Sequence, residues 1–543
     1  MATETKVYEK RWIGMIFISI SLIVISLDNT VLNVALPSIS RELGASASEL
    51  QWIIDAYILV FAALLLTMGS LGDRNGRKRL LQIGLIIFGI GSLGAAVASS
   101  TGMLIATRAF TGIGAAAIMP ATLSIITNMF SDPKERTKAI AVWAATFGLG
   151  VGIGPVIGGW LVESYGWNAV FFINLPIVVI ALAGGYFFLP ESFDKEALKA
   201  DVPGVLLSIV GLFALVYGII EAGMSSWTDG TVLIAFGIAA IFLGAFAIWE
   251  SRAPNAMLPM RFFKNMSFTG ANTAIALVFF GMMGSMFFFS QYFQSVQGLT
   301  AFEAGLRVLP ISLFLIVAAG ASTRLSARFG IKLTVGFGIL FAAAAMLYFS
   351  QVIAVDTPYS VILVGYLLLG IGMGTAMTPA TDSIMGSVPA VKAGIGSAMN
   401  DTTRQLGGAM GVAILGTVMN SVYLSEITSL EQAPFFSQLP EQAYAVIQSS
   451  IQGALIVAKQ VPVPQIAQVI TDTAGEAFVL GMTQAMFIAS LIMFAAALVT
   501  FAILPTRIQR ADKIADEVES VEAVETPESM PTPLPSPSAA AAD

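Results

Sequence analysis

The stretch Gly69-Ser70-Leu71-Gly72-Asp73-Arg74-Asn75-Gly76-Arg77-Lys78-Arg79 joins two long apolar segments of this chain. It is short, strongly basic and punctuated by glycines. Cationic side chains rarely cross to the outer side of a membrane, so a basic turn between two spanning segments marks the cytoplasmic face. The stretch therefore predicts a membrane protein whose second and third helices are joined on the cytoplasmic side.

The composition favours the same class of protein. The chain has 543 residues, of which 56% are hydrophobic and 11% charged, whereas about a quarter of a soluble domain is charged. Histidine and cysteine are both absent. This excludes disulfides, thiolate chemistry and histidine metal sites, and we expect neither a metal nor a cofactor. Any proton chemistry must use carboxylates.

Fourteen apolar runs are long enough to span a bilayer as helices, which takes about 20 residues. The first is Trp12–Leu36 and the last is Ala477–Leu504, with Ala169–Leu189 sixth and Gln405–Val422 thirteenth. An even number places both termini on one side. With the termini inside, the cytoplasmic segments hold every lysine and arginine of the chain except Arg41, Lys459, Arg108 and Arg307. We therefore predict an all-α protein with both termini in the cytoplasm.

The spans are expected to divide into two six-helix bundles, residues 1–200 and 256–505, with a two-helix linker at 201–255. A second, weaker basic turn at Arg324–Lys332 supports a duplicated plan, which is how many transporters alternate access. Within the second bundle, 423–476 is predicted to be a long outer loop that carries an amphipathic surface helix at Ala443–Val461. Residues 506–543 are predicted to be a disordered cytoplasmic tail. The excess of acidic residues that gives the net charge of −7 lies in this tail. The net charge therefore says nothing about partners of the rest of the chain, and no nucleic-acid partner is expected.

Several motifs resemble those of the major facilitator superfamily, in the branch of fourteen-span drug:proton antiporters of the EmrB and QacA type. The basic stretch resembles its loop between spans two and three. The other matches are Leu27–Pro37, Leu104–Gly114, Gly148–Gly159, Tyr292–Pro310 and Ala393–Gly411. The resemblance implies the major facilitator fold: two six-helix bundles plus two inserted helices.

Asp28 is the strongest candidate for a functional residue, because a carboxylate inside a span is costly. Burial favours its neutral form and a nearby cation its charged form, so the two effects can be balanced for reversible protonation. Helix rise places Asp28 roughly 6 Å and Arg108 about 8 Å from the outer boundary. Arg108 is therefore the expected cation, as the resemblance also implies. The alternative is a purely structural pair.

Two further sets of residues have roles implied by the resemblance. In the basic stretch, Gly72, Asp73, Arg74, Gly76 and Arg77 are expected to lock the two bundles together in the outward-open state; the alternative is that the charges only fix topology. In span five, the antiporter motif is expected to seal the outer side against leak, with a kink at its proline. Close helix packing alone is the alternative for that motif. Its residues are Gly150, Gly154, Pro155, Gly158 and Gly159.

Candidate substrate contacts are apolar and adaptable residues of span nine together with polar residues near the outer side. Most such residues face lipid in any membrane protein, and Asp55 lies where contact with water also explains it. The candidates are Asn33, Asp55, Tyr57, Met283, Phe287 and Gln291.

These features together predict a proton-coupled multidrug efflux antiporter of the bacterial plasma membrane, whose partners are small-molecule drugs or toxicants, protons and the lipid bilayer. The alternative is a dedicated exporter of one metabolite, lipid or toxin. An enzyme is not expected, because no cluster of polar catalytic groups is present. Whether a periplasmic adaptor is recruited is left open. Span ten, Phe302–Ala321, has only Glu303 at its outer edge, which predicts that lipophilic monovalent cations or neutral compounds are preferred over dications.

Overall fold

The computed structural model describes residues 11–43, 45, 47–193, 201–253, 256, 258–428, 430 and 440–509. The predicted tail from 510 onward, and the predicted boundary at residue 200, lie outside these residues. Within the described part, fourteen helices are long and apolar enough to cross a membrane, as predicted.

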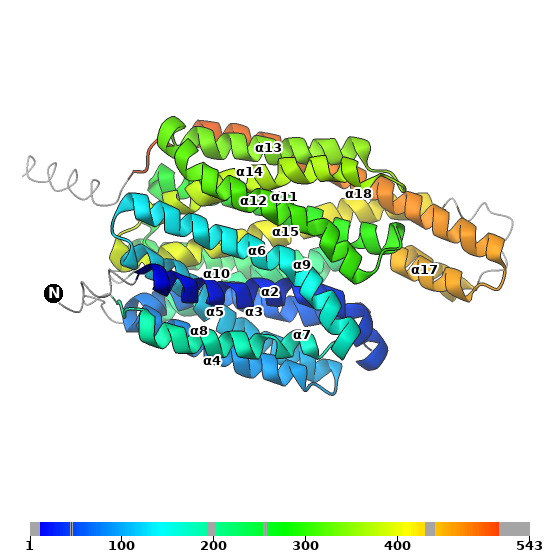
Figure 1. The fold of residues 1–543 in the computed structure, drawn as a ribbon, viewed down its shortest axis with the longest axis horizontal. Helices are drawn as coiled ribbons and strands as arrows, with labels where there is room; N and C mark the ends of the chain where they lie inside the picture. Colours follow the sequence, from blue (N-terminus) through cyan, green and yellow to red (C-terminus); the bar gives the residue numbers. More distant parts are fainter. Residues whose placement is uncertain are drawn as a thin grey trace, which may run out of the picture.

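The helices run nearly parallel or antiparallel to one another (Figure 1). Their bounds are α2 (Arg11–Leu43), α3 (Ala47–Asn75), α4 (Arg77–Ala96), α5 (Thr101–Met129), α6 (Pro133–Tyr165), α7 (Ala169–Phe172), α8 (Asn174–Phe188), α9 (Val202–Met224), α10 (Gly230–Arg252), α11 (Met266–Gln291), α12 (Ala301–Phe329), α13 (Ile331–Val352), α14 (Tyr359–Gly386), α15 (Ala393–Ile427), α16 (Glu441–Ser449), α17 (Ile451–Gln460) and α18 (Pro464–Ile503). Three short helical segments are η1 (Met260–Lys264), η2 (Tyr292–Val296) and η3 (Ala390–Lys392).

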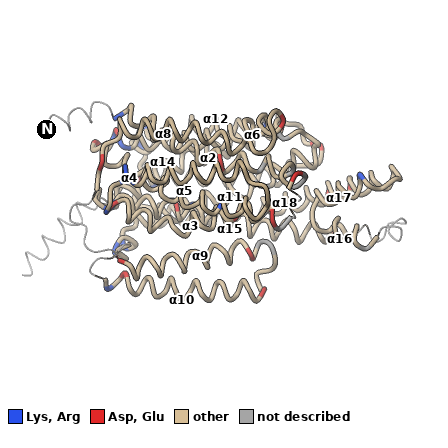
Figure 2. Tube along the Cα trace, turned by 90° about the horizontal axis from the view of Figure 1, so that it is seen from below, with Lys and Arg blue, Asp and Glu red and all other residues tan. Residues whose placement is uncertain are grey.

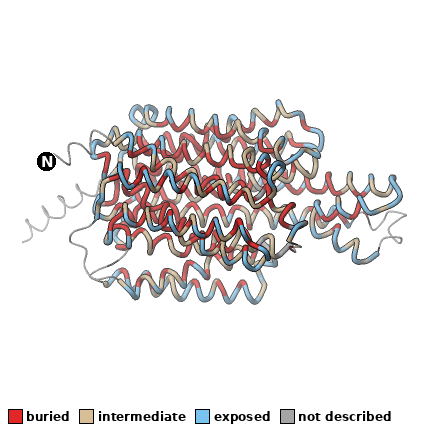
Figure 3. The backbone as a smooth tube through the Cα atoms, turned by 60° about the horizontal axis from the view of Figure 1, so that its bottom comes forward, coloured by how far each residue is buried: buried red, intermediate tan, exposed pale blue. Residues whose placement is uncertain are grey.

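Helices α2–α8 pack around two sets of buried apolar residues, and α11–α15 with α18 pack around a third. We call these groups the first and second bundles. They meet where α6 packs on α12 and where α3 and α5 pack on α15. Buried positions fill the centre and exposed positions follow the outer faces (Figure 3), as expected for helices that face lipid.

Helices α9 and α10 form a hairpin at the side of the two bundles, and Lys and Arg gather at one end of the molecule (Figure 2). The turn between α3 and α4 lies at that end, which we call the basic end. The hairpin touches the rest of the protein mainly through α9, which packs on α3 and α15. The outer face of α10 exposes large apolar side chains such as Ile234, Ile241 and Ile248.

Three predicted segments differ in the structure. The sixth run, Ala169–Leu189, is divided into α7 and α8 at Ile173, because Pro176 has no N–H to bond the carbonyl of Phe172. The thirteenth helix begins at Ala393 rather than Gln405, so Arg404 lies inside a helix and not in a cytoplasmic segment. The predicted surface helix Ala443–Val461 is wrong as one helix: Ser450 is extended and caps α17 by accepting from the N–H of Gly453, which separates α16 from α17. This pair projects beyond the end opposite the basic end (Figure 2).

Candidate functional site

Asp28 and Arg108 form a buried ion pair inside the first bundle. Arg108 Nη1 donates to Asp28 Oδ2 at 2.5 Å, and each side chain is 1% exposed. Arg108 Nε also donates to the carbonyl of Ile53, and its guanidinium carbon lies 4.4 Å from the centre of the Tyr57 ring. The charge of Arg108 is therefore shared between a carboxylate, a carbonyl and an aromatic face, all contributed by α2 and α3. The sequence prediction that these two residues lie at one depth agrees with this contact.

Two polar residues that were not predicted, Asn174 and Ser92, extend the hydrogen bonds of the ion pair. Asn174 of α8 donates from Nδ2 to Asp28 Oδ1 at 2.9 Å and to Ser92 Oγ at 3.2 Å. Asn174 lies five residues into its span, about 8 Å from the outer boundary, and that is the depth already derived for Arg108. Matching the depths of polar residues across spans would have found it. With Asn174 in place, both oxygens of Asp28 have partners within the bundle.

The glycines of α6 allow that helix to contact two neighbours closely. A Cβ atom on Gly150 or Gly154 would collide with Ser26 or Thr30 of α2, the helix that carries Asp28. On the other side of α6, Gly152 faces Ser312 and Gly159 faces Phe302, both on α12 of the second bundle. Gly158 packs on Val31, and Pro155 lies against Gly305. The glycine motif of α6 therefore packs on α2, which carries Asp28, and also on α12 of the second bundle.

The basic turn forms a hydrogen-bonded latch to the second bundle. Asp73 accepts from Nε and Nη2 of Arg77, at 2.8 and 2.6 Å, and from the backbone N–H groups of Gly394 and Ile395, at 2.8 and 3.1 Å. Arg77 also donates to the carbonyls of Ala390 and Val391, at 2.9 Å each. The carboxylate thus lies at the N-terminus of α15, where backbone N–H groups favour a negative charge. We refer to these contacts as the latch.

The remaining residues of the basic turn have different surroundings. Gly76 has a φ of 114°, which favours glycine, and Glu191 accepts from the backbone N–H groups of Lys78 and Arg79 that follow it. Gly72 packs on Leu80. Arg74 lies apart from the latch.

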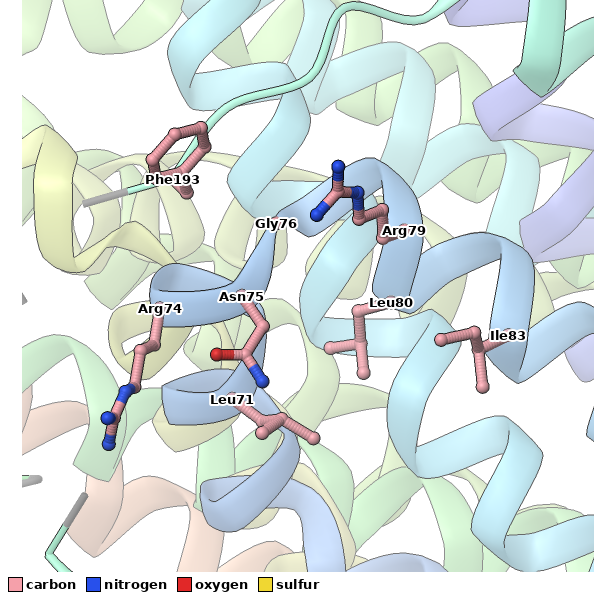
Figure 4. Close-up of a pocket in the computed structure, with 8 residues that line it drawn as sticks. All are labelled: Leu71, Arg74, Asn75, Gly76, Arg79, Leu80, Ile83 and Phe193. Atoms are coloured by element: carbon pink, nitrogen blue, oxygen red, sulfur yellow. The ribbon is translucent and has the colours of Figure 1, made fainter. Parts of the chain in front are cut away.

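Arg74 lines a surface cavity of about 440 Å³, with its guanidinium directed away from Gly76 and Arg79 (Figure 4). The cavity lies at the turn between α3 and α4, far along the helices from Asp28. Of the five residues predicted to form the switch, the structure therefore brings Asp73 and Arg77 together in the latch and leaves Arg74 outside it. The lining residues are Leu71, Arg74, Asn75, Gly76, Arg79, Leu80, Ile83 and Phe193.

A second cross-bundle contact, which was not predicted, joins α6 to α14 at the same end. Asp382 accepts from the hydroxyl of Thr137 at 2.7 Å and pairs with Arg136 at 3.6 Å. Together with the latch, this contact ties both α3–α4 and α6 to the second bundle. Cross-bundle polar contacts therefore gather at the basic end.

The second bundle has a buried ion pair of its own, also not predicted. Arg404 and Asp401 of α15 lie 3.8 Å apart and are 2% and 1% exposed. The Arg404 guanidinium lies over the rings of Trp143 on α6 and Phe279 on α11, at 4.6 and 5.2 Å from their centres. Polar residues surround the pair in sequence, from Asn400 to Gln405, and this made the start of α15 difficult to delimit. Two charges three residues apart on one helical face were the available signal.

The predicted substrate residues are not gathered in one place by the described contacts. Tyr57 is buried against Arg108 and Phe61, so it belongs to the ion-pair surroundings. Asp55 and Gln291 are partly buried on α3 and α11, and Met283 is partly buried where α11 packs against Gly408 of α15. The side chains of Asn33 and Phe287 lie outside the described residues. A binding role for these six residues stays a prediction.

Comparison with known proteins gives the family of the chain. The model of the Major Facilitator Superfamily matches residues 18–412. The chain belongs to this superfamily and is a multi-pass protein of the cytoplasmic membrane, with fourteen candidate spans. Membership in a family of transporters indicates a transporter rather than an enzyme.

The relatives found include two bacterial proteins. The chain is 35% identical to the multidrug efflux pump LfrA of Mycolicibacterium smegmatis, over 92% of this chain and 97% of that protein. It is 33% identical to the methyl viologen resistance protein SmvA of Salmonella typhimurium, over 87% and 93%. Among solved structures, the proton:xylose symporter XylE has the same fold, with a TM-score of 0.60, 13% identity and coverage of 94% of this chain and 99% of that chain.

Proposed function

We propose that this protein is a proton-coupled multidrug efflux antiporter that exports lipophilic monovalent cations or neutral compounds across the cytoplasmic membrane. The observation that carries the proposal is the buried Asp28–Arg108 pair, in a chain whose relatives include a multidrug efflux pump. A carboxylate buried within a span is a functional candidate by default. The pair lies within one bundle, where a proton can be bound and released without breaking the boundary between bundles.

In the proposed cycle, Asp28 accepts a proton from the outer side while the latch is closed. Protonation removes the negative charge that faces Arg108, and Arg108 keeps its bonds to the Ile53 carbonyl and the Tyr57 ring. The latch then opens, the basic end gives access to the cytoplasm, and Asp28 loses its proton as substrate binds. Substrate and proton thus move in opposite directions.

The alternating movement is proposed to occur between residues 1–200 and 256–505, with 201–255 as the linker between them. Contacts at the basic end support a state closed to the cytoplasm, since Asp73, Arg77 and Asp382 all bond across the bundles there. We place both termini on the cytoplasmic side on the basis of the positive charge at this end. We propose that the α6 glycines hold the outer half of α6 close to α12.

The test uses purified protein in proteoliposomes loaded with a panel of lipophilic dyes and antibiotics. Under an imposed proton gradient, we expect several unrelated compounds to be moved against their gradients, and a protonophore to abolish the movement. Movement of one compound alone would support the dedicated exporter. Movement of these compounds at a rate that the proton gradient does not change would contradict proton coupling.

A further inference from the structure

Two carboxyl groups meet at the basic end of the α9–α10 hairpin, and neither takes part in the ion pairs or the latch described above. Asp201 directly precedes α9 and accepts from the backbone N–H of Gly204 at 2.9 Å and from Trp249 Nε1 at 2.7 Å, both through Oδ1. Glu250 lies near the end of α10 and accepts from the backbone N–H of Leu258 at 2.9 Å through Oε2. The two residues close the open end of the hairpin.

The second oxygen of each carboxyl group, Oδ2 of Asp201 and Oε1 of Glu250, lies beside Gly204. A Cβ atom on Gly204 would collide with both Asp201 Oδ2 and Glu250 Oε1, so the two oxygens lie together beside this glycine. Glu250 is 3% exposed, and its Oε1 has no hydrogen-bond partner among the described residues. Two ionised carboxylates in this arrangement repel each other, whereas a single proton between them makes one a donor and the other an acceptor.

Among the described residues, the cationic side chains at this end of the hairpin differ in their exposure. Lys392 of η3 acts on Glu250 electrostatically. The other nearby cations, Arg252 at the end of α10 and Arg261 and Lys264 of η1, are exposed to solvent, where their effect is screened. Of these described cations, the partly buried Lys392 is therefore the one whose effect on Glu250 is least screened.

We propose that Asp201 and Glu250 form a proton-binding site that holds one proton between the two carboxyls, exchanged with the solvent at the basic end. This site is separate from Asp28 and does not depend on the proposed transport. Loss of the proton leaves two negative charges beside Lys392. Lys392 directly follows Ala390 and Val391, whose carbonyls accept hydrogen bonds from Arg77 in the latch. The protonation state of Asp201 and Glu250 therefore acts, through Lys392, on the segment that carries the latch.

The test is infrared difference spectroscopy of the protein in lipid nanodiscs, without substrate, as the pH is raised. The wild type is expected to lose the carbonyl-stretch band of a protonated carboxylic acid, and the band is expected to shift in D₂O. Glu250→Gln and Asp201→Asn should each lower the intensity of this band in the difference spectrum, to which Asp28 also contributes. Both replacements keep a side-chain oxygen for the backbone N–H groups that the acids bond. The matched control is Glu221→Gln, at the other end of the same hairpin, which should keep the band.

Hydrogen exchange of the same samples gives a second measurement. In the wild type, the backbone amides near residues 201–206 and 246–253 should exchange faster as the pH rises. The increase should exceed the intrinsic pH dependence of amide exchange, because the two carboxylates repel each other once both are ionised. The Glu250→Gln protein should lose this extra dependence. A band of unchanged intensity in both variants, or exchange with only the intrinsic pH dependence in the wild type, would overturn the proposal. Either result would leave the proposed antiport unaffected.

Discussion

The protein contains two nearly fully buried aspartate–arginine pairs in its first bundle, and they differ in what they bond. Asp28 and Arg108 find their partners on α2, α3, α5 and α8, all within that bundle. Asp73 and Arg77 instead bond to Ala390, Val391, Gly394 and Ile395 of the second bundle. A pair within one rigid bundle keeps its geometry while the bundles move, whereas a pair that bonds across the boundary must break. The first arrangement suits proton binding and the second suits a conformational lock.

The largest effect is expected from removal of the charge inside the bundle. Asp28→Asn keeps the size of the side chain but has no titratable proton, so proton-driven export should fall to background while the protein still folds. Arg108→Ala should also abolish coupled export, and it should destabilise the fold by about 3–5 kcal/mol because an unpaired carboxylate stays buried. Transport under a proton gradient and thermal unfolding measure these effects. Asp229→Asn, at an exposed helix cap, is the control. Export by Asp28→Asn with the normal pH dependence would exclude Asp28 as the coupling residue.

The next effect concerns the latch, and it should appear in the rate of transport rather than in substrate binding. Asp73→Asn removes the charge that holds Arg77 and faces the N-terminus of α15, so the state closed at the basic end should become less populated. Spectroscopic distances between labels on α3 and α15 would detect the opening. Lys78→Gln should have a milder effect, and Arg74→Gln a small one, because Arg74 lies outside the latch. If Asp73→Asn mainly abolished equilibrium binding, the role as a lock would be wrong.

The glycines of α6 offer a comparison between the two kinds of contact on one helix. Gly154→Ala forces α6 away from Thr30 inside the bundle, and we expect a loss of stability of about 1–3 kcal/mol from overpacking. Gly152→Ala instead pushes on Ser312 across the boundary, and its main effect should be on the balance between conformations. Gly237→Ala on α10 has open space around it and is the control. Equal effects of the first two substitutions on both measurements would contradict the distinction.

The smallest effect is expected in the choice between singly and doubly charged substrates. Exchange of one proton for one monovalent cation is electroneutral, whereas a dication must also move a net charge against the membrane potential, at a cost of about 2.3 kcal/mol per 100 mV. The preference for monovalent cations was predicted because span ten lacks a deep carboxylate. The structure adds the buried acids Asp382 and Asp401 on α14 and α15. We therefore expect a preference of less than about tenfold, or 1.4 kcal/mol. A larger ratio of initial export rates would show that these acids take no part.

The sequence determined the features that depend on short segments. Apolar length gave the fourteen spans, because a membrane-spanning helix must satisfy its own backbone hydrogen bonds. The order of local motifs indicated the superfamily that the comparisons confirm. The depth of Asp28 and Arg108 followed from helix rise alone, since residues of two antiparallel helices at equal depth can be matched without knowledge of packing.

The tertiary structure decided which side chains share a site. Helix depth made Asn174 available as a partner of Asp28, but only helix packing selected it. Packing likewise selected Arg136 and Thr137 as partners of Asp382, because these contacts join residues more than a hundred positions apart. The sequence also placed Arg404 in a loop, since a charge near the end of an apolar run is normally solvated. Arg404 is buried because Asp401 and two aromatic rings, one from the other bundle, surround it. Such compensation exists only once the helices pack, so the pattern of one helix cannot reveal it.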